Sequence, residues 1–219
     1  MPTSIVVIVV SNAATRRFSV TRAGKVRSKL VASAFTLFAQ KGFDGVNLDE
    51  IAALAGVTKG SLYWHFNSKR DLIHAACTYY YRTYQRKINE ALLEVTDPWE
   101  RLDRTLRVAV RTCLMDQQNR VFTMEIFTFS VHDEALRRGW QQFYDSVREF
   151  YIGLVKTASS AGKIHVSDPD QAVNLMLAAM EGVKLRALFE PEICSAHEEA
   201  KIVAGLWEIL GHRPEAVNA

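Results

Sequence analysis

The chain has 219 residues, of which 48% are hydrophobic and 23% charged, a balance typical of folded globular proteins rather than disordered or fibrous ones. Its three cysteines, Cys77, Cys113 and Cys194, are far apart and lack the short spacings of zinc sites and thiol redox motifs. The strongly apolar run from Ile5 to Val10 is far shorter than the roughly 18 residues that a membrane span needs. No basic residue precedes this run, as one would in a signal peptide. We therefore expect a cytoplasmic protein with no membrane partner, metal, cofactor or disulfide.

Positive charge is concentrated in the first part of the chain. Residues 16–87 contain 13 Lys and Arg against four Asp and Glu, whereas residues 88–219 contain 14 against 20. This asymmetry is typical of a protein of which one end meets a polyanion. A basic face that is merely solvated is the alternative that charge alone leaves open.

Two helices are predicted at the N-terminal end. Apolar residues at helical spacing predict a first helix over residues 25–40. Asn47, with Glu50 three residues later, has the arrangement of a capping box at the start of a short second helix. The buried stripe of this second helix is expected to contain Leu48, Ile51, Ala52 and Leu54.

The next two helices complete a recognisable supersecondary unit. Gly56 is expected to end the second helix, and Thr58 to cap a third over residues 59–65. Asn67-Ser68 is expected to cap a fourth helix that runs from Lys69 towards Leu93. Two short helices joined through a glycine predict a helix-turn-helix.

The remainder of the chain is also predicted to be helical. The boundary signals Asp97-Pro98, Gly162, Asp168-Pro169 and Glu190-Pro191 separate long periodic segments. The predicted helices cover residues 99–115, a segment ending near 130 after a polar turn at 116–119, and residues 133–161, 169–188 and 198–210. No strand is predicted, so the fold class is all-α.

The third predicted helix has a surface suited to a DNA groove. Gly56 permits the backbone angles of the turn, and Leu62 and Phe66 are expected in the core together with Leu48 and Ile51. The outward residues combine hydrogen-bonding groups, a positive charge and flat rings, and they are Thr58, Lys59, Ser61, Tyr63, Trp64 and His65. Trp64 is equally compatible with a partly buried packing role, and a histidine in the place of His65 more often caps a helix than reads a base.

The segment from Leu48 to Leu72 closely resembles the N-terminal signature of the tetracycline-repressor-like (TetR) family. The resemblance includes the Ala55-Gly56-Val57 turn, the Thr58-Lys59-Gly60-Ser61-Leu62-Tyr63 helix and the His65-Phe66 exit. It covers roughly residues 25–72, and the rest of the chain only in the number and lengths of helices. It implies that Thr58, Lys59 and Gly60 approach base edges and that Tyr63 and Lys69 contact the DNA backbone. The whole predicted DNA-binding set is Lys25, Asn47, Leu48, Thr58, Lys59, Gly60, Ser61, Tyr63, Trp64, His65 and Lys69.

The resemblance further implies a homodimer that pairs through its last two long helices. The predicted interface residues are Leu177, Met180, Leu188, Ile202, Leu206 and Ile209. Two-fold pairing would place two reading helices about one DNA turn apart, ~34–36 Å. The double-stranded DNA partner is therefore expected to be an inverted-repeat operator.

The helices before that interface are expected to hold a small-molecule effector. Their wealth of aromatic residues and methionines suits an apolar pocket, although for any one ring a role as core filler is the better-supported interpretation. Polar residues at mostly apolar positions are candidates to orient the ligand, because burying them without partners is costly. The predicted pocket residues are Arg107, Phe122, Glu125, Phe127, Trp140, Tyr144, Asn174 and Glu181. Such a lining favours a hydrophobic or aromatic effector.

The predicted organisation has five parts. They are a disordered N-terminal extension (1–21), a helix-turn-helix DNA-binding domain (22–68), a linking helix (69–94), an effector-binding and dimerisation domain (95–212) and a tail (213–219). Translation starting at Val20 instead of Met1 is a further hypothesis.

The sequence thus predicts a transcriptional regulator, most readily a repressor that an effector releases from its operator. The alternative is a helical DNA-binding architectural or partner-binding protein without an effector. An enzyme is not expected, because the sequence has no nucleophile elbow, glycine-rich phosphate loop, dinucleotide fingerprint or metal-spaced His/Glu set.

Overall fold

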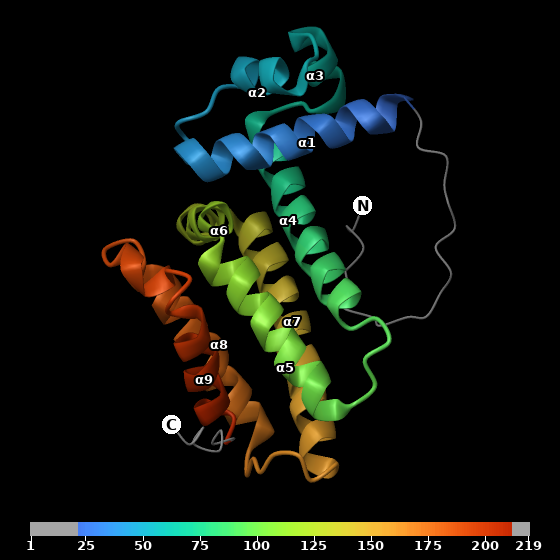
Figure 1. Ribbon diagram of the computed structural model, residues 1–219. Helices are drawn as coiled ribbons and strands as arrows, with labels where there is room; N and C mark the ends of the chain where they lie inside the picture. Colours follow the sequence, from blue (N-terminus) through green and yellow to red (C-terminus); the bar gives the residue numbers. More distant parts are fainter. Residues whose placement is uncertain (1–21, 212–219) are drawn as a thin grey trace. The chain divides into compact units, whose positions relative to one another are not determined.

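The computed structural model describes residues 22–211, and this span is helical throughout apart from short connections (Figure 1). Its elements are α1 (Arg22–Lys41), α2 (Leu48–Ala55), α3 (Lys59–His65), α4 (Lys69–Ala91), α5 (Pro98–Ala109), the π-helix η1 (Val110–Met115), α6 (Gln117–Ser130), α7 (Glu134–Ser160), α8 (Pro169–Arg186), the 3-10 helix η2 (Pro191–Cys194) and α9 (Glu199–Ile209). The predicted all-α fold class is confirmed. The predicted N-terminal extension (1–21) and the tail (213–219) lie outside the described residues.

The boundaries of α2 and α3 follow from local chemistry that the sequence displays. The Asn47 side chain accepts a hydrogen bond from the Glu50 N–H at 2.9 Å, and the Glu50 carboxylate accepts one from the Asn47 N–H at 3.2 Å. Gly56 ends α2 in the left-handed region with φ 67°, and the Thr58 hydroxyl accepts from the Ser61 N–H at the start of α3. The predicted helix-turn-helix is therefore confirmed, and α2 and α3 lie together beside α1 in Figure 1.

Two predicted details of the later helices are wrong, and one short element was missed. The polar segment 116–119 is not a turn, because the Asp116 carboxylate accepts from the Asn119 N–H at 3.1 Å and caps α6 there. The helix before it does not remain α-helical to Met115 but ends in η1. The 3-10 turn η2 was not predicted. Periodicity does not reveal a change of hydrogen-bonding pattern within an apolar helix.

The described chain forms two compact units. The N-terminal unit contains residues 22–84 and Val121–Trp140, and the C-terminal unit contains Gln85–Arg120 and residues 141–211. The helices α4, α6 and α7 each begin in one unit and end in the other. The units thus divide the chain differently from the predicted linear domains, which remain a prediction about function.

Apolar side chains from α1, α2 and α6 make the core of the N-terminal unit. Phe122 of α6 is buried, with its ring centroid 4.7 Å from that of Phe35 and 5.6 Å from that of Phe43. Ile51 is buried as predicted, but Leu48 is only half-buried and Leu54 is 53% exposed. The predicted stripe was too wide, because an eight-residue helix buries only the face centred on Ile51, Ala52 and Ala55.

A polar contact joins α9 to α5 inside the C-terminal unit. The Trp207 Nε1–H donates to Asp103 Oδ1 at 3.0 Å, and both residues are buried. Arg107 Nε donates to the other carboxylate oxygen of Asp103 at 2.7 Å, and the Trp99 ring stacks on Trp207 with centroids 5.7 Å apart. The Asp103 carboxylate therefore has a donor on each oxygen.

Glu94, in the turn between α4 and α5, is the one non-glycine residue of the described chain with positive φ, at 64°. We expect Glu94→Gly to raise the free energy of unfolding by about 0.5–1 kcal/mol, because glycine removes left-handed strain at a modest cost in unfolded-state entropy. The matched control Glu90→Gly, in the last turns of α4, should lower it by about 1 kcal/mol. Urea denaturation measures both, and a loss of stability in Glu94→Gly would contradict the strain.

Candidate nucleic-acid interface and effector region

The helix α3 turns a polar and aromatic face outward. Trp64 is 74% exposed and Tyr63 is 47% exposed, while Leu62 on the opposite face is fully buried. Thr58, Lys59 and Gly60 are exposed as well, and Ser61 and His65 are half-buried. Among the described residues the exposed Trp64 indole packs little, and its ring lies 4.6 Å from that of His65 at 87°. The outward orientation of this face is as predicted.

Lys59, the positively charged residue of this face, forms an ion pair with Asp49 of α2. Lys59 Nζ lies 2.9 Å from Asp49 Oδ2, and both side chains are exposed. The hydrogen bond to Asp49 and its negative charge raise the pKa of Lys59, so this side chain is an ammonium at neutral pH. An exposed pair of this kind contributes little to stability, so Lys59 can leave Asp49 at little cost.

The remaining predicted DNA contacts flank α3. Lys69 Nζ donates to the Asp44 backbone oxygen at 3.3 Å, which holds the side chain beside the turn before α2. Lys25 is exposed on α1, and Asn47 is exposed although its side-chain oxygen is engaged in the cap. Leu48 is half-buried. These four residues lie on α1, at the start of α2 and at the start of α4.

Two residues predicted to line an effector pocket instead belong to the core of the N-terminal unit. Glu125 of α6 accepts a hydrogen bond from the Phe43 N–H at 2.6 Å, which fixes α6 to the turn between α1 and α2. Phe122 is buried against Phe35 and Phe43. The prediction needs correcting here, because a half-buried carboxylate that already has a backbone donor does not require a ligand.

Phe127 and Trp140 lie in the same unit as neighbours of α4. Their ring centroids are 5.1 Å apart in an edge-on arrangement, and the Trp140 ring is 5.9 Å from that of Tyr81. These contacts fit the role of core filler that the sequence analysis left open.

A buried carboxylate fixes the corner between α6 and α7 to α4. Asp133 accepts hydrogen bonds from Arg70 Nε at 2.6 Å and Arg70 Nη2 at 3.1 Å, and it lies 3.2 Å from His74 Nε2. It also caps α7 by accepting from the Leu136 N–H at 2.9 Å. The Arg70 guanidinium is the main reason why the pKa of Asp133 lies well below its usual range. Sequence reasoning identified Asp133 as a helix start but did not find its contacts with Arg70 and His74, which lie about 60 positions away.

In the C-terminal unit the structure brings together two of the predicted pocket residues. Tyr144 of α7 hydrogen-bonds Glu181 of α8, and burial, followed by the Glu181 charge, raises the Tyr144 pKa. The buried Lys184 ammonium lies 3.0 Å from Glu181 Oε1 and 2.9 Å from Oε2. Sequence analysis missed Lys184, although a lysine three residues after Glu181 on an apolar helix was a visible signal.

The other two polar candidates are not buried. Asn174 is exposed on α8, and Arg107 is exposed and paired with Asp103 four residues earlier. The reason for choosing them, the cost of burying an unpartnered polar group, therefore does not apply to either.

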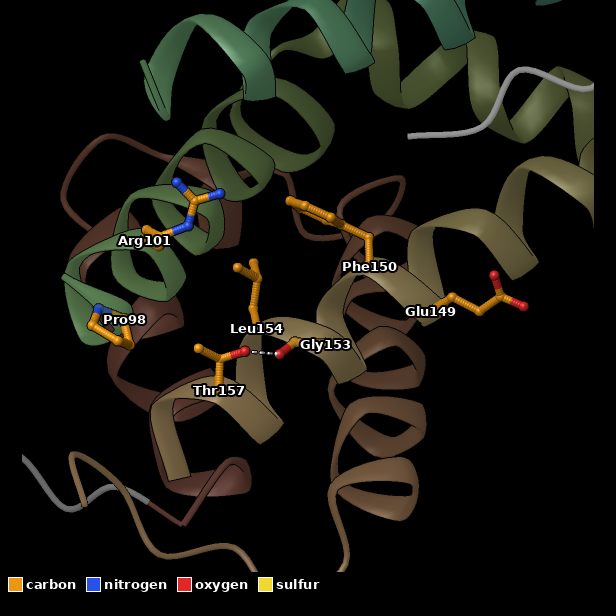
Figure 2. A pocket seen from close by; sticks show the side chains of 7 residues that line it. All are labelled: Pro98, Arg101, Glu149, Phe150, Gly153, Leu154 and Thr157. Carbon is orange, nitrogen blue, oxygen red and sulfur yellow. Dashed lines mark hydrogen bonds between the residues drawn. The ribbon is translucent and has the colours of Figure 1, made fainter. Parts of the chain in front are cut away.

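A pocket lies between α5 and α7 of the C-terminal unit, away from the predicted residues. Figure 2 shows its lining, with Phe150 and Leu154 projecting from α7 towards the side of α5 that carries Arg101. Its volume is about 270 Å³, and its lining residues are Pro98, Arg101, Glu149, Phe150, Gly153, Leu154 and Thr157. Sequence analysis did not anticipate it, because pocket shape depends on how two helices distant in sequence pack.

The predicted dimer stripe also needs correcting. Leu177, Met180 and Leu206 are buried within the C-terminal unit and are unavailable to a partner, while Ile202 and Ile209 are half-buried. Leu188 is exposed as predicted. The apolar residues that α8 and the turn after it leave exposed are Leu175, Leu185, Leu188 and Phe189, the last at 79%.

Within residues 22–211, no group of three or more His, Cys, Asp or Glu side chains is placed to hold a metal ion. In the same span, no helix combines the length and apolar character needed to cross a bilayer.

Comparisons with known proteins agree with the geometry of α1 to α4. The family model described as bacterial regulatory proteins, tetR family, matches residues 30–76. The HTH-type transcriptional regulator TtgR of Pseudomonas putida is 26% identical over 176 residues, covering 78% of this chain and 83% of TtgR. The negative transcriptional regulator IcaR of a Staphylococcus aureus biofilm operon is 45% identical over 47 residues, 22% of this chain and 25% of IcaR. A crystal structure of a TetR-family transcriptional regulator from Rhodococcus sp. superposes with a TM-score of 0.69 and 25% identity, covering 86% of this chain and 99% of that one.

The lowered pKa of Asp133 makes its contribution to stability depend on pH. The contribution is present above the usual carboxyl pKa of about 3.9 and is lost as the pH falls towards the lower folded-state value. We expect Asp133→Asn to lower the free energy of unfolding at pH 7 by about 1.5–3 kcal/mol, the range for hydrogen bonds to charged groups.

Chemical denaturation between pH 7 and pH 3 measures this effect. The difference between Asp133→Asn and the unmodified chain should narrow below about pH 4. Glu134→Gln, which neutralises an exposed neighbour on α7, should have a smaller effect. A difference that stays constant down to pH 3 would contradict the role of the ionised carboxylate.

Proposed function

Because the chain belongs to the tetR family of bacterial regulatory proteins, whose members are DNA-binding transcriptional regulators and not enzymes, we propose that it is a cytoplasmic repressor that a small effector releases from its operator. The observation that carries this proposal is the outward face of α3, where exposed Lys59, Tyr63 and Trp64 stand opposite a buried Leu62. Helices that read DNA present such a face to the major groove.

The roles proposed at the interface differ from residue to residue. Thr58, Lys59 and Gly60, in the first turn of α3, approach base edges, and Lys59 exchanges Asp49 for the DNA. Tyr63 and Lys69 contact phosphates and position the helix without reading sequence. Trp64 adds apolar contact at the same face.

We propose that the regulator acts as a homodimer through α8 and α9. Leu175, Leu185, Leu188 and Phe189 form an apolar face on and just after α8 that a second copy would cover. Two-fold pairing presents two copies of α3 about one DNA turn apart, which corresponds to an inverted-repeat operator.

The proposed response to an effector depends on helices that both units share. Within the N-terminal unit, Glu125 of α6 accepts from the Phe43 N–H, and Asp133, at the corner between α6 and α7, contacts Arg70 and His74 of α4. The first turn of α6 and most of α7 belong to the C-terminal unit. An effector that binds more tightly to one position of these helices would therefore shift the equilibrium between two positions of α3. The free energy of that shift cannot exceed the difference between its binding free energies for the two states.

A footprint and mobility-shift assay on the DNA upstream of its own gene, at stated salt, tests the proposal. Protection of an inverted repeat with nanomolar-range affinity is expected, and a small molecule that weakens the complex would support the sensor over an architectural DNA-binding protein. Absence of binding at low salt, to this DNA and to genomic fragments, would contradict DNA regulation altogether.

Two substitutions distinguish phosphate contacts, which position the protein on DNA, from base contacts, which read the sequence. Lys69→Ala should weaken binding to all sequences and reduce the slope of log affinity against log salt by about 1, because it removes one phosphate contact. Lys59→Ala should instead reduce the preference for the operator over mutated half-sites. Titrations at several salt concentrations measure both, and an unchanged salt slope in Lys69→Ala would rule out its phosphate role.

A further inference from the structure

Arg101 differs from the other arginines of its helix and of η1. Those arginines each hold a carboxylate at 2.6–2.7 Å, in the pairs Arg104–Glu100, Arg107–Asp103 and Arg111–Glu199. Arg101 forms no ion pair with any residue of the described chain, and its Nη1 donates to the Val95 backbone oxygen at 2.7 Å. A guanidinium has five N–H donors, so most of them remain for another acceptor.

The acidic residue at helical ion-pair spacing before Arg101 is already engaged. Asp97, four positions before Arg101, caps α5 by accepting from the Glu100 N–H at 2.9 Å and lies 3.3 Å from Lys163 Nζ. The hydrogen bond to Glu100 is the main reason why the pKa of Asp97 is lowered. The charge of Arg101 is therefore not neutralised by its own helix.

Arg101 lines the pocket between α5 and α7, next to an apolar floor. Pro98, Phe150 and Leu154 supply the floor, and Leu154 is buried. The volume of about 270 Å³ lies just under the ~300–1,000 Å³ of sites for drug-sized ligands, which fits a body the size of a single ring. In Figure 2 the Glu149 carboxylate points away from the other lining side chains.

We propose that this pocket binds a small apolar monocarboxylic acid as its anion, with the carboxylate on Arg101 and the apolar body on Phe150 and Leu154. The planar guanidinium fork matches a carboxylate, and the first turn of α5 adds the positive end of the helix dipole. Glu149 at the rim disfavours a second negative charge on the ligand. Only the role of the acid as effector rests on the proposed function, because binding of the acid to the pocket does not require DNA.

Gly153 allows the pocket to be filled without breaking a contact. It lies within α7, and a Cβ built on it has no heavy atom within 4 Å. A leucine there would extend into the pocket and raise helix propensity. Gly139 of α7 also has open space at its Cβ and does not line the pocket, so Gly139→Leu is a matched control.

Calorimetry on the full chain with benzoate, phenylacetate and hexanoate, against the neutral probes benzamide and benzyl alcohol, tests the proposal. Benzoate should bind about tenfold or more tightly than benzamide, as expected for a charge-assisted bidentate contact. Gly153→Leu should abolish binding of all the acids while Gly139→Leu leaves it unchanged. Arg101→Met should remove the preference for acids, and Arg101→Lys should retain part of it.

The outcomes separate this inference from the proposed function. Equal binding of benzoate and benzamide, or unchanged binding in Gly153→Leu, would overturn the site or its chemistry whatever the protein does with DNA. Failure of all the acids to bind would overturn it as well. Binding that leaves the operator complex intact in a mobility shift would overturn the effector role, whereas absence of any specific DNA complex would overturn the proposed function alone.

Discussion

The interface depends on a helix that cannot be stable by itself. The seven residues of α3 form about two turns, far below the length at which an isolated helix persists in water. Its conformation therefore rests on a few contacts: the Thr58 cap, the buried Leu62, the buried Phe66 that ends it and the left-handed Gly56 before it. Because so few residues hold α3, most of its surface stays exposed for a partner. Because α3 is held by so few contacts, a small change in the position of α1, α2 or α4 changes the direction in which its exposed surface points.

The position of α3 therefore also depends on two carboxylates of the N-terminal unit, one in α6 and one at the corner between α6 and α7. Glu125 satisfies the Phe43 N–H in the turn before α2, and Asp133 joins α4 to the start of α7. Hydrogen bonds to charged groups contribute about 1.5–3 kcal/mol, more than a neutral surface contact does. Movement of α6 relative to α1 or α4 would lengthen such bonds, so these elements are expected to move as one body.

The sequence predicted what is local and missed what depends on distant partners. The Asn47 capping box, the Gly56 turn, the Thr58 cap and the proline starts of α5 and α8 require only residues within four positions, and all are present. Glu125 was read as a ligand contact because its donor, the Phe43 N–H, lies 82 positions away. Leu177, Met180 and Leu206 were assigned to a partner because apolar periodicity identifies a buried face but does not say what covers it. The contents of the candidate site were therefore less predictable than its supporting helices.

The arginines of α5 show why spacing alone was insufficient for the pocket. Each of Arg101, Arg104 and Arg107 has an acidic residue four positions earlier, so the helical rule for ion pairs predicts a partner for all three. Asp97 is the exception, because it stands at the N-cap, where the Glu100 N–H and Lys163 engage its carboxylate. The cap that starts α5 thus leaves Arg101 without the partner that its spacing predicts. The unpaired charge of Arg101 beside Pro98, Phe150 and Leu154 is therefore a consequence of how α5 begins.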